Sequence, residues 1–160
     1  MPETHIILVA EDDPHDAFLL QRAFFRAQVL QPLHFVTDGK QAIDYLKGAP
    51  PFHNRERFPL PTLLVLDLKL PLVTGLDVLT WLSRQPELNR LHTVVLSGSQ
   101  DPDQIERAYA YGADYCMLKP AGEEKLVEAV RHLKRHWLDL PVAVANPQQN
   151  TSRSFLAANL

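Results

Sequence analysis

Polar side chains of complementary kinds follow four short apolar runs of this chain, each at the point where the run ends. Three carboxylates, Glu11, Asp12 and Asp67, follow two of these runs, and the other two end at Ser97 and Lys119. Mg²⁺ prefers oxygen ligands, and a divalent cation relieves the repulsion between neighbouring carboxylates. A hydroxyl and an ammonium are suited to bind phosphoryl oxygens. If these side chains meet in space, they form a site for a hard cation and a phosphoryl group.

Asp67 differs from the other acids because it follows the most apolar run, 63–66. A carboxylate can attack phosphorus and form an acyl phosphate. That transfer depends on an in-line donor, a metal on the phosphoryl oxygens and a nearby cation, for which Lys119 is the candidate. Each residue alone has a simpler interpretation: a serine at a strand end is more often a cap, and a lysine usually keeps its charge in water. The convergence of several such groups favours the phosphoryl site.

The apolar runs have the length and composition of strands buried on both faces of a parallel sheet. Five such segments are expected, at 6–10, 33–37, 63–66, 93–96 and 116–118. A helical pattern follows each of them, and strict alternation of this kind predicts an α/β fold with helices on both faces of the sheet. Ligands of such sheets bind beyond the carboxyl ends of the strands. The predicted fold therefore places the five polar residues at one edge.

Several local signals mark the helix ends. Asp13 followed by Pro14 is typical of an N-cap and a first helical residue, and Asp38 with Gln41 has the form of a capping box. The segment 49–61 contains four prolines and is expected to be a surface loop. We expect one domain at 1–137 and a C-terminal tail without an output domain at 138–160.

Composition excludes several classes of protein. The net charge of −3 offers no basic field for nucleic acid, and no stretch approaches the roughly 18 apolar residues of a membrane-spanning helix. The one cysteine, Cys116, lies inside an apolar run, so we expect no disulfide framework and a cytoplasmic location.

The order and spacing of these residues match a known family over roughly 5–137. The chain resembles the receiver domain of two-component response regulators, whose pattern is seen in the pair Glu11-Asp12, in Asp67 with Pro71 and Gly75, in Ser97, and in Lys119-Pro120. The resemblance implies a doubly wound, flavodoxin-like sheet of five parallel strands in the order 2-1-3-4-5. It also implies that the Lys119–Pro120 peptide bond is cis.

The resemblance further implies a metal site. Asp12 and Asp67 are expected to bind Mg²⁺ together with the backbone carbonyl of Lys69, while Glu11 acts through a metal-bound water. Asp67 is in addition the expected phosphoacceptor.

The remaining two residues are expected to act on the phosphoryl group. Ser97 would bind it and report its presence, and Lys119 would pair with its charge.

Three positions depart from the family pattern or bear on it. Ser97 replaces the commoner threonine, and Cys116 occupies the place of the usual aromatic residue, with Tyr115 one position earlier. Lys69 lies two residues after the phosphoacceptor, where its side chain can change the lifetime of the acyl phosphate.

By this resemblance the chain is a single-domain response regulator. It takes a phosphoryl group from a sensor histidine kinase, and it is similar to the regulators that partner phytochrome-type kinases. The expected readout surface consists of the fourth helix, the fifth strand and the fifth helix. Through it the protein would bind a partner, form a homodimer or pass phosphate along a relay. The protein is not expected to be an enzyme beyond gaining and losing its own phosphoryl group.

Two alternatives remain open from the sequence. The first is a pseudo-receiver that binds proteins without phosphorylation. Its usual mark, a broken acidic pair or a missing nucleophile or lysine, is absent, although Cys116 keeps it open. The second is a magnesium-dependent phosphohydrolase, which usually needs a second acid at the position of Lys69 and a cap domain. A flavodoxin-like mononucleotide binder is excluded because the acidic loop 11–14 would repel phosphate.

Overall fold

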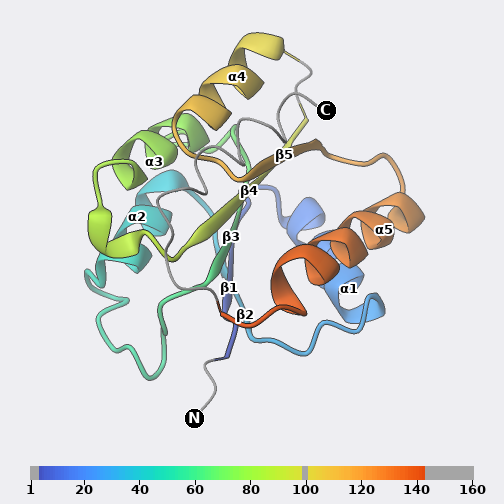
Figure 1. Cartoon of the computed structure of the whole chain (residues 1–160), viewed down its shortest axis with the longest axis horizontal. Helices are drawn as coiled ribbons and strands as arrows, with labels where there is room; N and C mark the ends of the chain where they lie inside the picture. Colours follow the sequence, from blue (N-terminus) through green and yellow to red (C-terminus); the bar gives the residue numbers. More distant parts are fainter. Residues whose placement is uncertain (1–3, 99–100, 143–160) are drawn as a thin grey trace.

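Five parallel strands form a single sheet in the order β2-β1-β3-β4-β5 (Figure 1). The computed structural model describes residues 4–98 and 101–142. The strands are β1 Ile7–Ala10, β2 Leu33–Val36, β3 Leu63–Leu66, β4 His92–Ser97 and β5 Tyr115–Leu118. The strand order and the parallel pairing confirm the predicted doubly wound fold.

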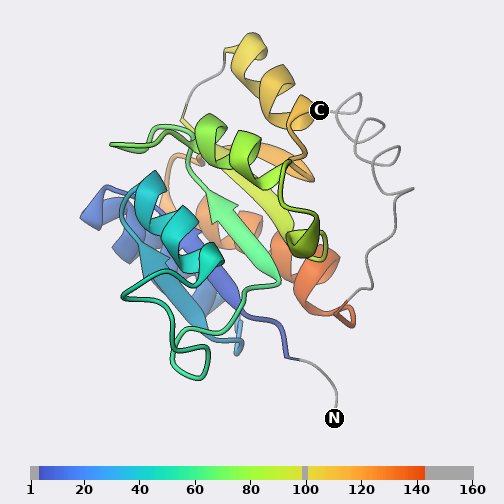
Figure 2. The ribbon, with the colours of Figure 1, turned by 90° about the vertical axis from the view of Figure 1, so that its left-hand side faces the viewer.

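Helices cover both faces of this sheet. They are α1 Pro14–Arg26, α2 Gly39–Lys47, α3 Gly75–Leu82, α4 Pro102–Ala110 and α5 Glu123–Leu133. Figure 1 shows α2 and α3 on one side of the sheet and α1 and α5 on the other, and Figure 2 presents the α2–α3 side. A short 3₁₀ turn, η1 Pro86–Leu88, precedes β4, and a π-helical turn, η2 Lys134–Leu138, continues α5.

Alternation along each strand produces two cores. In β1, Ile7 and Val9 pack with α1 and α5, while Leu8 and Ala10 pack with α2, α3 and α4. Because successive side chains of a strand point to opposite faces, a wholly apolar strand is needed where both faces are covered. This explains why β1 and β3 contain no polar residue.

Asp13 and Asp38 are confirmed as N-caps, but the predicted capping box of α2 is only half formed, because the Gln41 side chain accepts from the Thr37 N–H at 3.1 Å. The Asp13 carboxylate accepts hydrogen bonds from the backbone N–H of His15 and Asp16, and Asp38 accepts one from Gln41. Asp101 caps α4 in the same way. These caps fix where each helix begins after its strand, and hence which residues remain at the carboxyl edge of the sheet.

The proline-containing segment between α2 and β3 has neither helix nor strand, as predicted. It is nevertheless held in place by Arg55, whose guanidinium donates hydrogen bonds to the carbonyl oxygens of Tyr45, Leu46 and Phe58 at 2.8, 3.0 and 3.2 Å. The rings of Tyr45, Phe52 and Phe58 pack on one another. The loop is therefore anchored to the end of α2.

The predicted boundary between domain and tail lies at the end of η2, where Leu138 is buried in the α1–α5 core. Residues 143–160 of the predicted tail lie outside the described residues, so the division at 137 stays a prediction. Within 4–98 and 101–142, no helix combines the length and the apolar character needed to cross a bilayer.

Candidate functional site

Strand register brings the predicted residues to one edge of the sheet. Ala10 of β1 pairs with Leu66 of β3, so that Glu11 and Asp67 follow at the same level. The Asp67 N–H donates to the carbonyl oxygen of Ala10 at 3.2 Å. On the other side, the Lys119 N–H donates to the carbonyl oxygen of Ser97 at 2.8 Å. The predicted convergence of these strand ends is thus observed.

The Lys119 ammonium is the centre of the charged network. Its Nζ atom lies 2.6 Å from Glu11 Oε2 and 2.9 Å from Asp67 Oδ2. A third carboxylate oxygen, Oδ2 of Asp16, lies 3.1 Å away. Glu11 and Asp67 are buried, with side chains 4% and 7% exposed, whereas the Lys119 side chain is 25% exposed. The ammonium therefore closes the site on its solvent side.

Burial and ion pairing act in opposite directions on these groups. Burial alone would lower the pKa of Lys119, but hydrogen bonds to Glu11 and Asp67 outweigh it, so the pKa of Lys119 rises above its ordinary value. Burial raises the pKa of Glu11, although the Lys119 ammonium and the Asp13 N–H oppose that rise. Ion pairing therefore outweighs burial for the Lys119 ammonium, whereas burial outweighs ion pairing for the Glu11 carboxyl.

The acidic residues have the composition of a hard-cation site. One carboxylate oxygen from each of Glu11, Asp12 and Asp67 lies within 4.8 Å of the others, and Asp12 is exposed while the other two are buried. A set of carboxylate oxygens suits Mg²⁺, which prefers oxygen ligands and is usually held by one or two carboxylates. Lys119 provides positive charge to two of the three carboxylates, those of Glu11 and Asp67. The cluster could therefore hold a metal ion.

The loop after β3 helps to fix the orientation of the Asp67 carboxylate. The Lys69 N–H donates to Asp67 Oδ1 at 3.0 Å, while the Lys69 side chain is exposed. Gly75, at the start of α3, packs against this loop, and a Cβ there would lie 2.4 Å from the carbonyl oxygen of Asp67. This close approach gives a physical reason for the spacing between Asp67 and Gly75.

Ser97 is also in the predicted place. It ends β4, pairs in register with Leu118, and is 1% exposed. Gly98 follows it, and residues 99–100 lie outside the described residues.

The structure shows how β5 accommodates Cys116. Strand register is kept: Cys116 is buried on the α2–α3–α4 side, and Tyr115 packs on the α5 side, 5.2 Å from the His132 ring and 5.9 Å from the Trp137 ring between centroids. Tyr115 therefore does not turn inward to take the place of the usual aromatic residue. Instead, the Cys116 N–H donates to the Tyr109 hydroxyl of α4 at 2.9 Å.

The prediction that the Lys119–Pro120 peptide bond is cis is wrong. Among the described residues, the cis X–Pro bond is Pro50–Pro51. The trans form is the intrinsically preferred isomer of X–Pro bonds, so a pattern match alone is weak evidence for cis.

Asp16 is a site carboxylate that motif spacing does not identify. It lies in the first turn of α1, where acids are common because they complement the helix dipole. Its position three residues after the N-cap Asp13 is a possible signal, yet the sequence cannot show that it turns toward Lys119.

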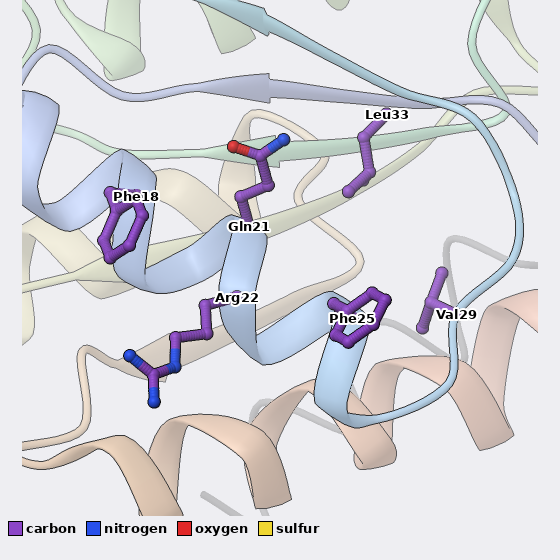
Figure 3. A pocket seen from close by; sticks show the side chains of 6 residues that line it. All are labelled: Phe18, Gln21, Arg22, Phe25, Val29 and Leu33. Carbon is purple, nitrogen blue, oxygen red and sulfur yellow. The ribbon is translucent and has the colours of Figure 1, made fainter.

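A groove elsewhere on the surface is separate from this site. Figure 3 shows its lining, which comes from α1, from the segment before β2 and from the first residue of β2. The lining residues are Phe18, Gln21, Arg22, Phe25, Val29 and Leu33.

Comparison with known proteins identifies the family. The model of the response regulator receiver domain matches residues 7–131. The probable methanogenesis regulatory protein FilR2 of Methanothrix harundinacea is 36% identical over 133 residues, which are 83% of each chain.

Two solved structures are similar in fold and length. The phosphorylated cyanobacterial phytochrome response regulator RcpA has a TM-score of 0.78 and 31% identity, with 85% of this chain and 95% of that chain covered. The Mn²⁺-bound response regulator Rcp1, known from Synechocystis, has a TM-score of 0.77 and 27% identity, with 89% and 99% covered. The protein thus resembles the phytochrome-partner type of receiver, and it belongs to the response regulator receiver domain family.

Proposed function

We propose that this protein is a response regulator that accepts a phosphoryl group on Asp67 and thereby switches a protein-binding surface. The observation that carries the proposal is the contact of Lys119 with Asp67 and Glu11 at the carboxyl edge of the sheet. A nucleophilic carboxylate, neighbouring acids that can hold a metal ion and a nearby ammonium are groups that phosphoryl transfer uses. The phosphorylated form of the similar regulator RcpA supports the same conclusion.

Each residue has a distinct part in the transfer. An Asp67 oxygen attacks the phosphorus of a phosphohistidine; the P–O bond to Asp67 forms as the P–N bond breaks, and the imidazole keeps the electron pair. Lys119 pairs with the phosphoryl charge, and the Ser97 hydroxyl donates to a phosphoryl oxygen.

Glu11, Asp12, Asp67 and the backbone carbonyl of Lys69 would hold Mg²⁺. The ion, when bound, neutralises charge on the phosphoryl oxygens. The fit rests on the oxygen-only donor set described above, and the Mn²⁺-bound form of Rcp1 supports a divalent cation. The exposed Lys69 side chain has no part in this scheme beyond its effect on the lifetime of the acyl phosphate.

The donor in this proposal is a sensor histidine kinase of the phytochrome type, by analogy with RcpA. The switching surface consists of α4, β5 and α5, through which the protein also forms a homodimer or passes phosphate along a relay. The hydrogen bond between Tyr109 and Cys116 joins α4 to β5. A shift of either element would therefore strain or break this bond and so affect the position of the other element. We place the protein in the cytoplasm, where the buried Cys116 stays reduced.

Intact-protein mass spectrometry after incubation with a small phosphodonor tests this function. We expect a gain of one phosphoryl group with Mg²⁺ present, and no gain without Mg²⁺ or in Asp67→Ala. A wild-type protein that gains no mass with any donor would contradict the proposal and favour the phosphorylation-independent pseudo-receiver. Release of phosphate from small phosphate esters, measured in the same samples, would favour a phosphohydrolase.

A further inference from the structure

Two helices of this chain begin with an acid at the third helical position, and they use it differently. In α3, Asp77 closes a capping box: its carboxylate accepts from the Thr74 N–H at 3.2 Å and from the Thr74 hydroxyl at 2.9 Å. In α1, the equivalent residue is Asp16. The N–H of the α1 N-cap, Asp13, donates instead to Glu11 Oε1 at 3.1 Å.

Because the Asp13 N–H bonds to Glu11, the Asp16 carboxylate does not close a capping box and makes a different contact. Its Oδ2 atom lies 3.1 Å from Lys119 Nζ, 103 positions away along the chain. The backbone N–H of Asp16 donates to the Asp13 carboxylate at 3.3 Å, which fixes the first turn of α1 in this orientation. The geometry of the helix start is therefore compatible with a capping box, yet the side chain is turned to the site.

The Lys119 ammonium has three N–H donors, and three carboxylates surround it. Two of these, Glu11 and Asp67, also belong to the acidic cluster that would hold a divalent cation. Lys119 and that cation thus need the same carboxylates. Asp16 is outside the cluster and, at 40% exposed, lies on its solvent side.

We propose that Asp16 is a positioning residue that keeps the Lys119 ammonium at the site when Glu11 and Asp67 turn to a divalent cation. The inference rests on the cation site of the proposed function. With Asp16 present, Lys119 keeps a charged partner while it gives up part of its contact with the cluster. Without Asp16, every shift of Glu11 or Asp67 toward the cation leaves the half-buried ammonium less well paired.

Isothermal titration of the whole protein with Mg²⁺ tests this role without any phosphodonor. We expect Asp16→Asn to weaken Mg²⁺ binding roughly fivefold, the size expected for a partly exposed ion pair. Asp16→Glu, which keeps the carboxylate, should recover most of the affinity. The matched control is Asp77→Asn, which removes the equivalent acid of α3 and should leave the affinity within about twofold.

A double-mutant cycle with Lys119→Met separates positioning from simple loss of negative charge. If Asp16 acts through Lys119, Asp16→Asn should change the affinity by less than about twofold in the Lys119→Met background. An equal loss in both backgrounds, or no loss in the wild-type background, would overturn the inference, as would a wild-type protein that binds no Mg²⁺. Unfolding midpoints of all variants show that each is folded. A protein that binds Mg²⁺ but accepts no phosphoryl group would contradict the proposed function alone.

Discussion

The Lys119 ammonium lies 2.9 Å from the Asp67 carboxylate, although 52 positions separate the two residues along the chain. The parallel sheet makes this contact possible, because β3 and β5 end at the same edge with β4 between them. The contact pairs the proposed nucleophile with the cation that would stabilise its product. It also means that Lys119 competes with any other cation for Asp67 and Glu11.

Removing the Lys119 charge should separate these two effects. In Lys119→Met we expect Mg²⁺ to bind several-fold more tightly, because a competing cation has left the acidic cluster. Phosphorylation from a small donor should nevertheless slow by at least about tenfold, because the charge that stabilises the phosphoryl group is lost. Calorimetric titration and timed intact-mass measurements check the two parts. Lys47→Met, which removes an exposed lysine from the last turn of α2, is the control and should leave both Mg²⁺ binding and phosphorylation unchanged. Weaker Mg²⁺ binding in Lys119→Met would contradict the competition.

Two glycines give a matched test of the loop that carries Asp67. In Gly75→Ala the new Cβ would lie 2.4 Å from the Asp67 carbonyl oxygen and 2.6 Å from the Leu68 Cα, so the backbone must shift. We expect a loss of about 1–3 kcal/mol in the free energy of unfolding, together with slower phosphorylation. Gly98→Ala, where nothing lies within 4 Å of the added Cβ, should stay within about 0.5 kcal/mol. Equal effects of the two substitutions on urea unfolding would argue against this explanation.

The fold and most of the site could be predicted because they depend on local patterns. Apolar runs specify strands buried on both faces, and the polar residue that ends each run, such as Asp67 or Ser97, must then lie at the carboxyl edge. The direction in which a side chain of the first helical turn points cannot always be predicted from such local patterns. Thr74 with Asp77 has the form of a capping box in the sequence. The sequence cannot show that Asp16 turns to Lys119, because that contact depends on a lysine far along the chain.

The same limit applies to β5. Alternation correctly predicts that Tyr115 and Cys116 face opposite sides of the sheet. It cannot predict that Tyr109 of α4 supplies a hydroxyl to the Cys116 N–H, since that contact depends on how α4 packs against the edge strand.

The buried thiol of Cys116 should make stability sensitive to alkaline pH. Burial raises the pKa of Cys116 from 9.0 to about 12. Because the folded pKa lies above the unfolded one, this contribution is present below pH 9.0 and is lost as the pH rises toward 12. Between pH 8 and 11 we expect the wild type to lose on the order of 2 kcal/mol more than Cys116→Ala in its free energy of unfolding. Urea titrations at several pH values measure this difference, and parallel pH profiles of the two proteins would contradict it.

The hydroxyl of Tyr109 should stabilise the edge strand. It accepts the hydrogen bond of the Cys116 N–H at 2.9 Å, so Tyr109→Phe leaves that buried amide without this partner. We expect a loss of about 1–2 kcal/mol in the free energy of unfolding and faster hydrogen exchange at the Cys116 amide. Tyr111→Phe is the control on the same side of the sheet. Unchanged exchange at Cys116 in Tyr109→Phe would show that the bond contributes little.

The most direct test of the central claim is to locate the phosphoryl group in the chain. After incubation with a phosphodonor and Mg²⁺, the acyl phosphate is reduced with borohydride and the protein is digested for peptide mass spectrometry. We predict that the reduced residue is Asp67, and that it is absent from samples without donor. Reduction at Glu11 or Asp12 instead, or at no residue of a folded, Mg²⁺-saturated protein, would contradict the assignment of Asp67 as the phosphoacceptor.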